Sequence, residues 1–161
     1  MKIYFYNKKK DSLISKVIKK VTGAYNHVSI GYNTSLKGEP LERDYIFEAI
    51  SGRIGQSGVF SSDNPNDFHQ GKHAADITEI DLGIMPNETE ARHFLLNQVG
   101  KKYDFGWFIS FVFFWVQGKA DAWGCSELAY KAISIGYGVE PSETKISPSL
   151  LYDICKLLKA K

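Results

Sequence analysis

The sequence predicts an α+β domain, with an antiparallel sheet packed against helices. One observation predicts this class, and a second predicts the number of domains. Segments with strand-type alternation come first along the chain and segments with helical periodicity follow, which is typical of α+β proteins. The chain has 161 residues, a length that fits one domain and buries a core, and it shows neither an internal repeat nor a linker. We therefore expect a single domain over residues 1–161.

Strands are expected in four segments. Lys2–Tyr6 and Ala75–Leu82 alternate polar and apolar side chains, and His27–Tyr32 and Tyr45–Ile50 are rich in β-branched and aromatic residues. A loop joins the two middle segments, so an antiparallel, hairpin-like pair is the simplest arrangement for them. Three further segments are assigned more coarsely: a helix over Asp11–Thr22, a strand–turn–strand over Ser51–Gly58 and a polar loop over Ser61–His73.

Helices are expected mainly in the second half of the chain. Asn87–Val99 has a helix start, with Asn87 as the cap and Glu90 in the capping-box position. Asp104–Val116 is expected to be a buried helix, and Ser126–Ile135 a helix that ends at Gly136. Pro148 opens the last helix. Five of its apolar residues are expected inside: Leu150, Leu151, Ile154, Leu157 and Leu158.

Composition is that of an ordinary globular protein. Hydrophobic residues make up 43% and charged residues 24%, and the net charge of +2 is too weak to predict a nucleic-acid partner. The longest apolar run, Phe105–Val116, is shorter than the ~18–20 residues of a membrane span. It is predicted to be a buried helix, with a lipid-contacting segment as the alternative. Met1–Lys20 shows no signal peptide, so we expect a cytoplasmic location.

The two cysteines, Cys125 and Cys155, have different surroundings. Cys125 follows the turn-like pair Trp123-Gly124 and precedes a helical run, so it should lie in the first turn of a helix. The backbone amides and the helix dipole there favour a thiolate and can hold an oxyanion. Cys155 lies on the apolar stripe of the final helix, where packing in the core is expected. Cys125 is therefore the candidate nucleophile.

A thiolate nucleophile needs a base and acid, normally a histidine. His27 opens a predicted strand, and a strand terminus gives a fixed and partly exposed position. His93 lies inside a predicted helix and is expected to be a surface or structural residue. His69 and His73 have a metal-ligand spacing only if their segment is helical, and the polar loop around them argues against this. We expect no metal site and no cofactor.

Glu48 is an acid inside an otherwise apolar strand, and buried acids rarely lack a partner. If its strand pairs with the strand of His27, Glu48 can lie across from His27 on one face. It would then orient the imidazole, as the third member of a triad does. The alternative is an edge-strand glutamate that points to water. The residues alone leave both interpretations open.

Four short segments occur in a particular order along the chain. They are Asn26-His27-Val28-Ser29-Ile30, Phe47-Glu48-Ala49, Gly100-Lys101-Lys102-Tyr103-Asp104 and Trp123-Gly124-Cys125-Ser126-Glu127-Leu128. Together they resemble the NlpC-type cell-wall peptidase superfamily, in its circularly permuted branch, where the His strand precedes the Cys helix. The resemblance implies a papain-like core, with the nucleophile at a helix N-terminus packed on the antiparallel sheet that carries the histidine.

The resemblance also implies roles for four residues. Cys125 would be the nucleophile, His27 the general base and acid, and Glu48 the third member of the triad. Tyr103 matches a family tyrosine whose hydroxyl lies near the nucleophile; its alternative role is that of a core ring. The activity implied is that of a cysteine hydrolase, an amidase or peptidase, which cleaves a peptide, amide or ester through a thioester.

The chain departs from the family pattern in two places. Met1–Gly23 carries a lysine-rich strand and helix instead of the usual Gly-Asp-hydrophobic strand, and the stretch between Tyr103 and Cys125 is long and aromatic. The aromatic stretch motivates a second hypothesis, lipid acyl transfer or phospholipid hydrolysis on a lipid-like acyl substrate, with peripheral membrane contact. A third hypothesis is a non-catalytic binding module on the same scaffold. The oligomeric state is not predicted.

Overall fold

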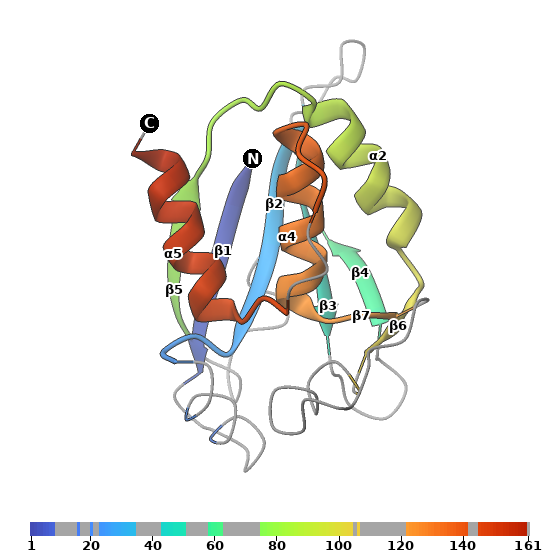
Figure 1. Ribbon diagram of the computed structural model, residues 1–161. Coiled ribbons are helices and arrows are strands. Elements are labelled where there is room, and N and C mark those ends of the chain that lie inside the picture. The colour runs from blue at the N-terminus through green and yellow to red at the C-terminus, as the bar shows by residue number, and fades with distance from the viewer. Residues whose placement is uncertain are drawn as a thin grey trace.

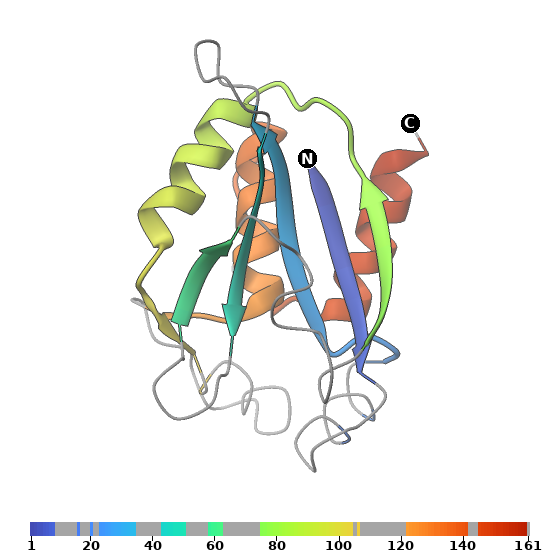
Figure 2. The same cartoon turned by 180° about the vertical axis from the view of Figure 1, so that it is seen from behind.

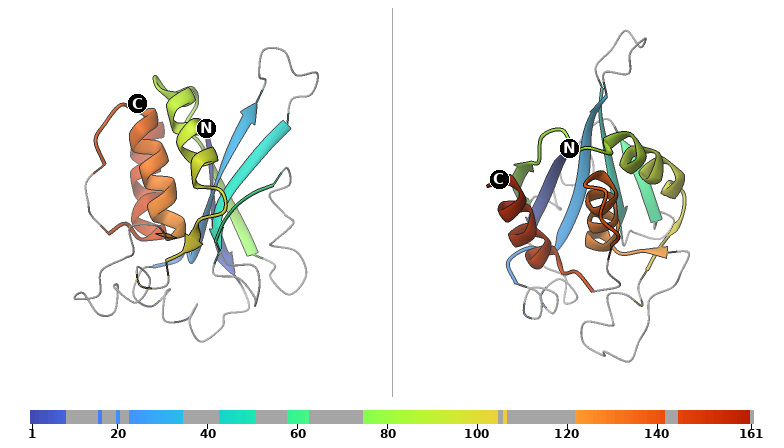
Figure 3. Two further views of the ribbon diagram at one scale, coloured as in Figure 1. Left: turned by 90° about the vertical axis from the view of Figure 1, so that its right-hand side faces the viewer. Right: turned by 45° about the horizontal axis from the view of Figure 1, so that its top comes forward.

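The computed structural model describes residues 1–8, 16, 20, 23–34, 43–50, 58–62, 75–104, 106, 122–141 and 145–160. These residues form a mixed α+β fold with a five-stranded antiparallel sheet, a short two-stranded sheet and three helices (Figure 1). The three helices form one layer and the sheet forms the other, as the edge-on view in Figure 3 shows. The predicted α+β class is confirmed.

The main sheet has the strand order β4-β3-β2-β1-β5. Its strands are β1 (Lys2–Lys8), β2 (His27–Thr34), β3 (Arg43–Ile50), β4 (Gly58–Ser62) and β5 (Ala75–Asp81). All four predicted strands are present, and β2 and β3 form the expected antiparallel pair. The predicted polar loop begins too early, because Ser61 and Ser62 belong to β4 and pair with Phe47 and Ile46 of β3.

The helices are α2 (Glu88–Gln98), α4 (Cys125–Gly136) and α5 (Pro148–Lys159). At α5 the predicted start is confirmed, and Ser147 Oγ accepts a 3.1 Å hydrogen bond from Leu150 N. At α2 the predicted N-cap position is confirmed at Asn87, but the side chain of Asn87 makes no capping hydrogen bond. Its amide nitrogen lies against Gly138 instead, just beyond the end of α4.

Side-chain alternation sorts the sheet into two faces. One face packs against the helices, and its core includes Phe5, Val28, Ile30, Tyr32 and Phe47 from the strands with Cys125, Leu128, Leu151 and Cys155 from the helices. The other face carries a second buried cluster of Tyr4, Tyr6 and Ile46. The chain therefore buries aromatic side chains on both sides of β1, which is flanked by β2 and β5 (Figure 2).

The inward face of α5 is narrower than predicted. Leu151 and Cys155 are fully buried, whereas Leu150 is 45% exposed and Leu157 is 71% exposed. The expectation that all five apolar residues lie inside is therefore wrong for these two. A helix that lies at the margin of a two-layer fold buries only one stripe, so the other apolar positions face outward.

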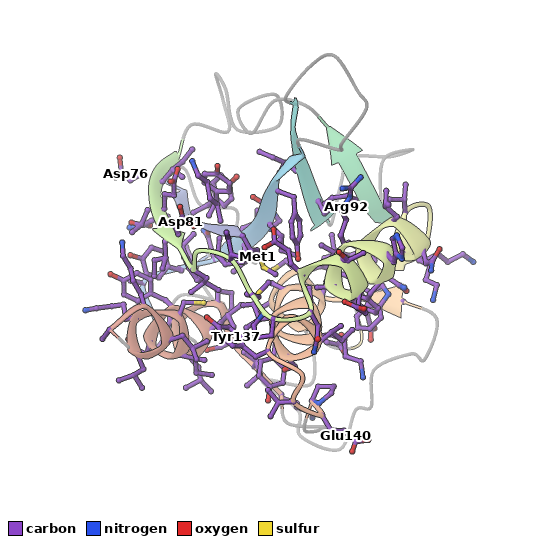
Figure 4. The ribbon with its side chains drawn as sticks, turned by 90° about the horizontal axis from the view of Figure 1, so that it is seen from above. Met1, Asp76, Asp81, Arg92, Tyr137 and Glu140 are labelled. Atoms are coloured by element: carbon purple, nitrogen blue, oxygen red, sulfur yellow. The ribbon has the colours of Figure 1, made fainter. Side chains whose placement is uncertain are left out.

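Tyr32 is the largest polar-tipped side chain in the helix-side core. It is 1% exposed, and within the described part of the chain its hydroxyl has no hydrogen-bond partner. Burial raises the pKa of this phenol, with a smaller contribution from the Glu88 carboxylate. The positive charge of Arg92 in α2 lowers the pKa of Tyr32. Figure 4 looks down on this end of the molecule, with Arg92 on the side of α2 that faces the sheet.

Several predicted segments lie outside the described residues. They include the aromatic run Phe105–Val116 except Gly106, the loop that carries His69 and His73, and most of the helix Asp11–Thr22, of which Lys16 and Lys20 are helical and exposed. Among the helices that the structure does describe, none has the length and apolarity needed to cross a membrane.

Candidate functional site

Cys125 is the first residue of α4, as predicted. The chain enters the helix through Gly124, which is extended with φ −80° and ψ 153°, and the first helical hydrogen bond runs from Leu128 N to Gly124 O at 3.0 Å. The side chain of Cys125 is buried, with 4% of the residue exposed. A thiol at this position lies within the positive field of the helix N-terminus, which favours its ionised form.

Tyr103 lies beside the turn that leads to Cys125. The short strands β6 (Lys102–Tyr103) and β7 (Ala122–Trp123) pair in parallel, with Tyr103 opposite Trp123. Asp104 N extends the contact by donating a 3.0 Å hydrogen bond to Trp123 O. The Gly-x-x-Tyr-Asp and Trp-Gly-Cys segments, separated in the sequence, are thus brought side by side.

His27 is the first residue of β2 and is also buried, at 7% exposed. The segment before it is held from two sides: Asn26 N donates to Tyr6 O at 3.0 Å, and Tyr25 N donates to Ser149 Oγ of α5 at 3.2 Å. Gly23 has φ +99°, and a Cβ there would lie 2.6 Å from Ser149 Oγ. That conformation and that spacing both favour glycine, which has no Cβ to clash with Ser149.

Cys125 and His27 lie at the same end of the fold. Helix α4 packs against β2, and the two elements run in the same direction, so their first residues lie at the same end of the molecule (Figure 1). Alternation separates them in depth, because Val28 faces α4 while the ring of His27 contacts Tyr6. The ring of His27 therefore lies on the Tyr6 side of β2, and Cys125 belongs to the helix-side core.

Glu48 does not lie directly across from His27. The last pair of the β2–β3 register is Ile30 with Phe47, and continuing it by one residue brings position 48 level with Ser29. On that continuation, position 48 is diagonal to His27 rather than opposite it. Glu48 does not lie on an edge strand, because β3 lies between β2 and β4 and Glu48 pairs with Phe60 of β4.

Two carboxyl groups near the nucleophile were not singled out from the sequence. Glu127 Oε2 accepts a 3.2 Å hydrogen bond from Gly124 N at the helix start. Burial raises the pKa of Glu127, the hydrogen bond from Gly124 lowers it, and the Asp104 carboxylate raises it again. Asp104 is itself only 1% exposed. The signal for Glu127 was its position three residues after Gly124, the spacing of a capping box. Negative charge here opposes a thiolate at Cys125.

Cys155 provides an internal contrast to Cys125. It lies in the middle of α5 and is fully buried, and burial raises its pKa to about 12. A thiol with such a pKa is almost entirely protonated near neutral pH and is a poor nucleophile. The prediction that Cys155 packs in the core is confirmed.

Comparison of the chain with protein-family models and with curated proteins finds no match. The relation to NlpC-type peptidases remains a prediction made from the four sequence segments. The geometry of the described residues brings two of them, those of Tyr103 and Cys125, into direct backbone contact. It brings the segment of His27 to the same end of the fold.

Proposed function

We propose that the chain is a cysteine hydrolase with a permuted papain-like core, which cleaves an amide or ester bond. One observation carries the proposal. The helix that begins at Cys125 packs on the strand that begins at His27, and both residues are buried at the same end. Tyr103 supports it, because its segment lies beside the nucleophile turn, where the family resemblance requires a tyrosine.

In the proposed reaction the Cys125 sulfur attacks the substrate carbonyl carbon. A carbon–sulfur bond forms, the carbonyl π electrons move onto oxygen, and the amides of the first turn of α4 stabilise the oxyanion. By the family resemblance, the Tyr103 hydroxyl would assist as a further donor. His27, which took the thiol proton, gives it to the leaving nitrogen or oxygen as that bond breaks, leaving a thioester.

The second half of the reaction regenerates the enzyme. A water molecule, deprotonated by His27, attacks the thioester carbonyl, and the carbon–sulfur bond breaks to release the acid and the thiol. Glu48 would orient the imidazole and stabilise its charged form. The ring of Tyr6 lies beside the imidazole, with the two ring centroids 5.3 Å apart. This sequence of steps uses only groups of the chain and water.

The test is the hydrolysis of p-nitrophenyl acetate and of the corresponding anilide by purified wild type, Cys125→Ala, His27→Ala and Cys155→Ala. We expect Cys125→Ala to reduce turnover to the background rate and His27→Ala to reduce it by about 10²–10⁴-fold. Cys155→Ala is the matched thiol control and should keep most of the activity. A Cys125→Ala protein with the wild-type rate would refute the proposal.

A further inference from the structure

Gln98, the last residue of α2, connects that helix to the nucleophile turn. It is 6% exposed, and both ends of its side-chain amide are bonded: Nε2 donates to Phe94 O at 2.9 Å, and Oε1 accepts from Trp123 Nε1 at 3.0 Å. A buried amide is costly to leave unpaired, so these two bonds determine its orientation. The amide thereby ties β7 to α2.

Trp123 is held from several directions as a result. Its indole N–H is bonded to Gln98, and its ring stands edge-on to Phe94 with the centroids 5.5 Å apart. Its backbone oxygen accepts the hydrogen bond from Asp104 N, and it pairs with Tyr103. Both its ring and its backbone are therefore fixed relative to α2 and β6.

Gly124 alone separates Trp123 from Cys125. Glycine has no Cβ to restrict its backbone, so its conformation depends on what anchors the residues on either side. On the helix side Glu127 accepts from Gly124 N at 3.2 Å. On the strand side the anchor is Trp123, whose indole N–H donates a hydrogen bond to Gln98 Oε1.

We propose that Gln98 is a positioning residue for Cys125. Its hydrogen bond to Trp123 sets the direction in which the chain enters α4, and hence where the Cys125 sulfur lies. The catalytic consequence rests on the proposed function, whereas the effect on thiol reactivity does not. Errors of about 1 Å in the placement of a reacting group cost up to about 10²-fold in rate, so a small rotation of this turn matters.

The test is a double-mutant cycle with Gln98→Leu, Trp123→Phe and the double variant, in a Cys155→Ala background with one thiol. Trp123→Phe removes the indole N–H and keeps an aromatic ring near Phe94. The matched control is Asn97→Leu, the same amide-to-leucine change at the exposed neighbouring position. Two quantities are measured: the pH profile of Cys125 alkylation by iodoacetamide, and kcat and KM for p-nitrophenyl acetate.

We expect each single variant to lower kcat by about tenfold with little change in KM, and to change the alkylation profile. The double variant should be no worse than either single one, because both remove the same bond. Gln98→Glu, which keeps an oxygen acceptor for the indole N–H, should recover part of the loss. Asn97→Leu should match the background protein.

Two results would overturn the proposal. In one, Gln98→Leu and Trp123→Phe lower the melting temperature but leave the alkylation profile and kcat unchanged, which makes the bond structural alone. In the other, the effects of the two changes add fully, which shows that they do not act through a shared bond. Failure of the proposed function is recognised separately, by wild-type hydrolysis no faster than that of Cys125→Ala. Even then the alkylation profile decides the role of Gln98.

Discussion

Tyr6 and His27 are register partners across β1 and β2, and their ring centroids lie 5.3 Å apart. Tyr6 is fully buried, and its hydroxyl shares a 2.7 Å hydrogen bond with Ser29 Oγ, two residues further along β2. One side chain of β1 therefore contacts two successive positions on the same face of β2. His27, the candidate base, therefore packs against a tyrosine ring whose hydroxyl is itself hydrogen-bonded.

Tyr6→Phe tests that anchor. The change keeps the ring beside His27 but leaves the buried Ser29 hydroxyl without its partner, so we expect the free energy of unfolding to fall by about 1–3 kcal/mol. Urea denaturation measures it. Ser29→Ala is the matched partner change, and the double variant should lose less than the sum of the two single losses. Fully additive losses would contradict a shared bond.

Tyr32→Phe should have the opposite outcome. Within the described residues the Tyr32 hydroxyl has no hydrogen-bond partner, so its removal relieves the cost of burying an unpaired polar group. We expect the free energy of unfolding to stay the same or to rise by about 1 kcal/mol, measured under the same conditions as for Tyr6→Phe. A loss as large as that of Tyr6→Phe would mean that the Tyr32 hydroxyl does have a partner.

Local signals in the sequence predicted the elements that carry the site. The turn-like pair before Cys125 and the helical run after it place the residue correctly, because a helix start is determined by a few neighbouring residues. The same holds for Ser147 at the start of α5 and for the strand that begins at His27. In each case the residues that determine the feature are adjacent in the chain.

Features that depend on distant segments were not predicted. The pairing of Tyr103 with Trp123 involves strands of two residues, too short to show any periodicity. The position of Glu48 relative to His27 depends on a register that hydrophobic patterning restricts only to one face, and the pairing differs by two residues from the expected one. Glutamine in a helix is usually exposed to solvent, and Gln98 is buried only because α2 packs beside β7.

The buried thiol of Cys155 should make the stability of the folded protein depend on pH. Burial raises its folded-state pKa from 9.0 to about 12, so the folded protein holds this proton more tightly than the unfolded chain. The resulting stabilisation is fully present below about pH 8.5, the ordinary range for a cysteine, and is lost as the pH rises toward the folded-state value. Cys155→Ala removes the effect.

The measurement is urea denaturation of wild type and Cys155→Ala between about pH 8 and about pH 10.5. The wild type should lose stability relative to the variant by up to about 1.4 kcal/mol per pH unit in the upper part of this range. The difference between the two proteins isolates Cys155 from tyrosines and lysines that titrate nearby in pH. Parallel curves would show that the thiol does not stay protonated in the folded state.

Glu127→Gln separates the two effects of the acid at the start of α4. Glutamine keeps an oxygen that accepts from Gly124 N, but it removes the charge that opposes a thiolate at Cys125. We therefore expect the alkylation profile of Cys125 to move to lower pH in this variant. Glu127→Ala is the control, because it also removes the charge but loses the hydrogen bond. It should be less stable than Glu127→Gln at every pH.

The stability of the same variant should also depend less on pH. Burial raises the pKa of Glu127 above its ordinary value of 4.5, so its contribution to stability is present below that value and is lost as the pH rises through the folded-state pKa. Glu127→Gln does not titrate and lacks this loss. Its stability relative to wild type should therefore increase from about pH 4 to about pH 7 in urea denaturation. If both proteins had the same pH dependence, the carboxylate would be ionised as readily in the fold as in the unfolded chain, and burial would not raise its pKa.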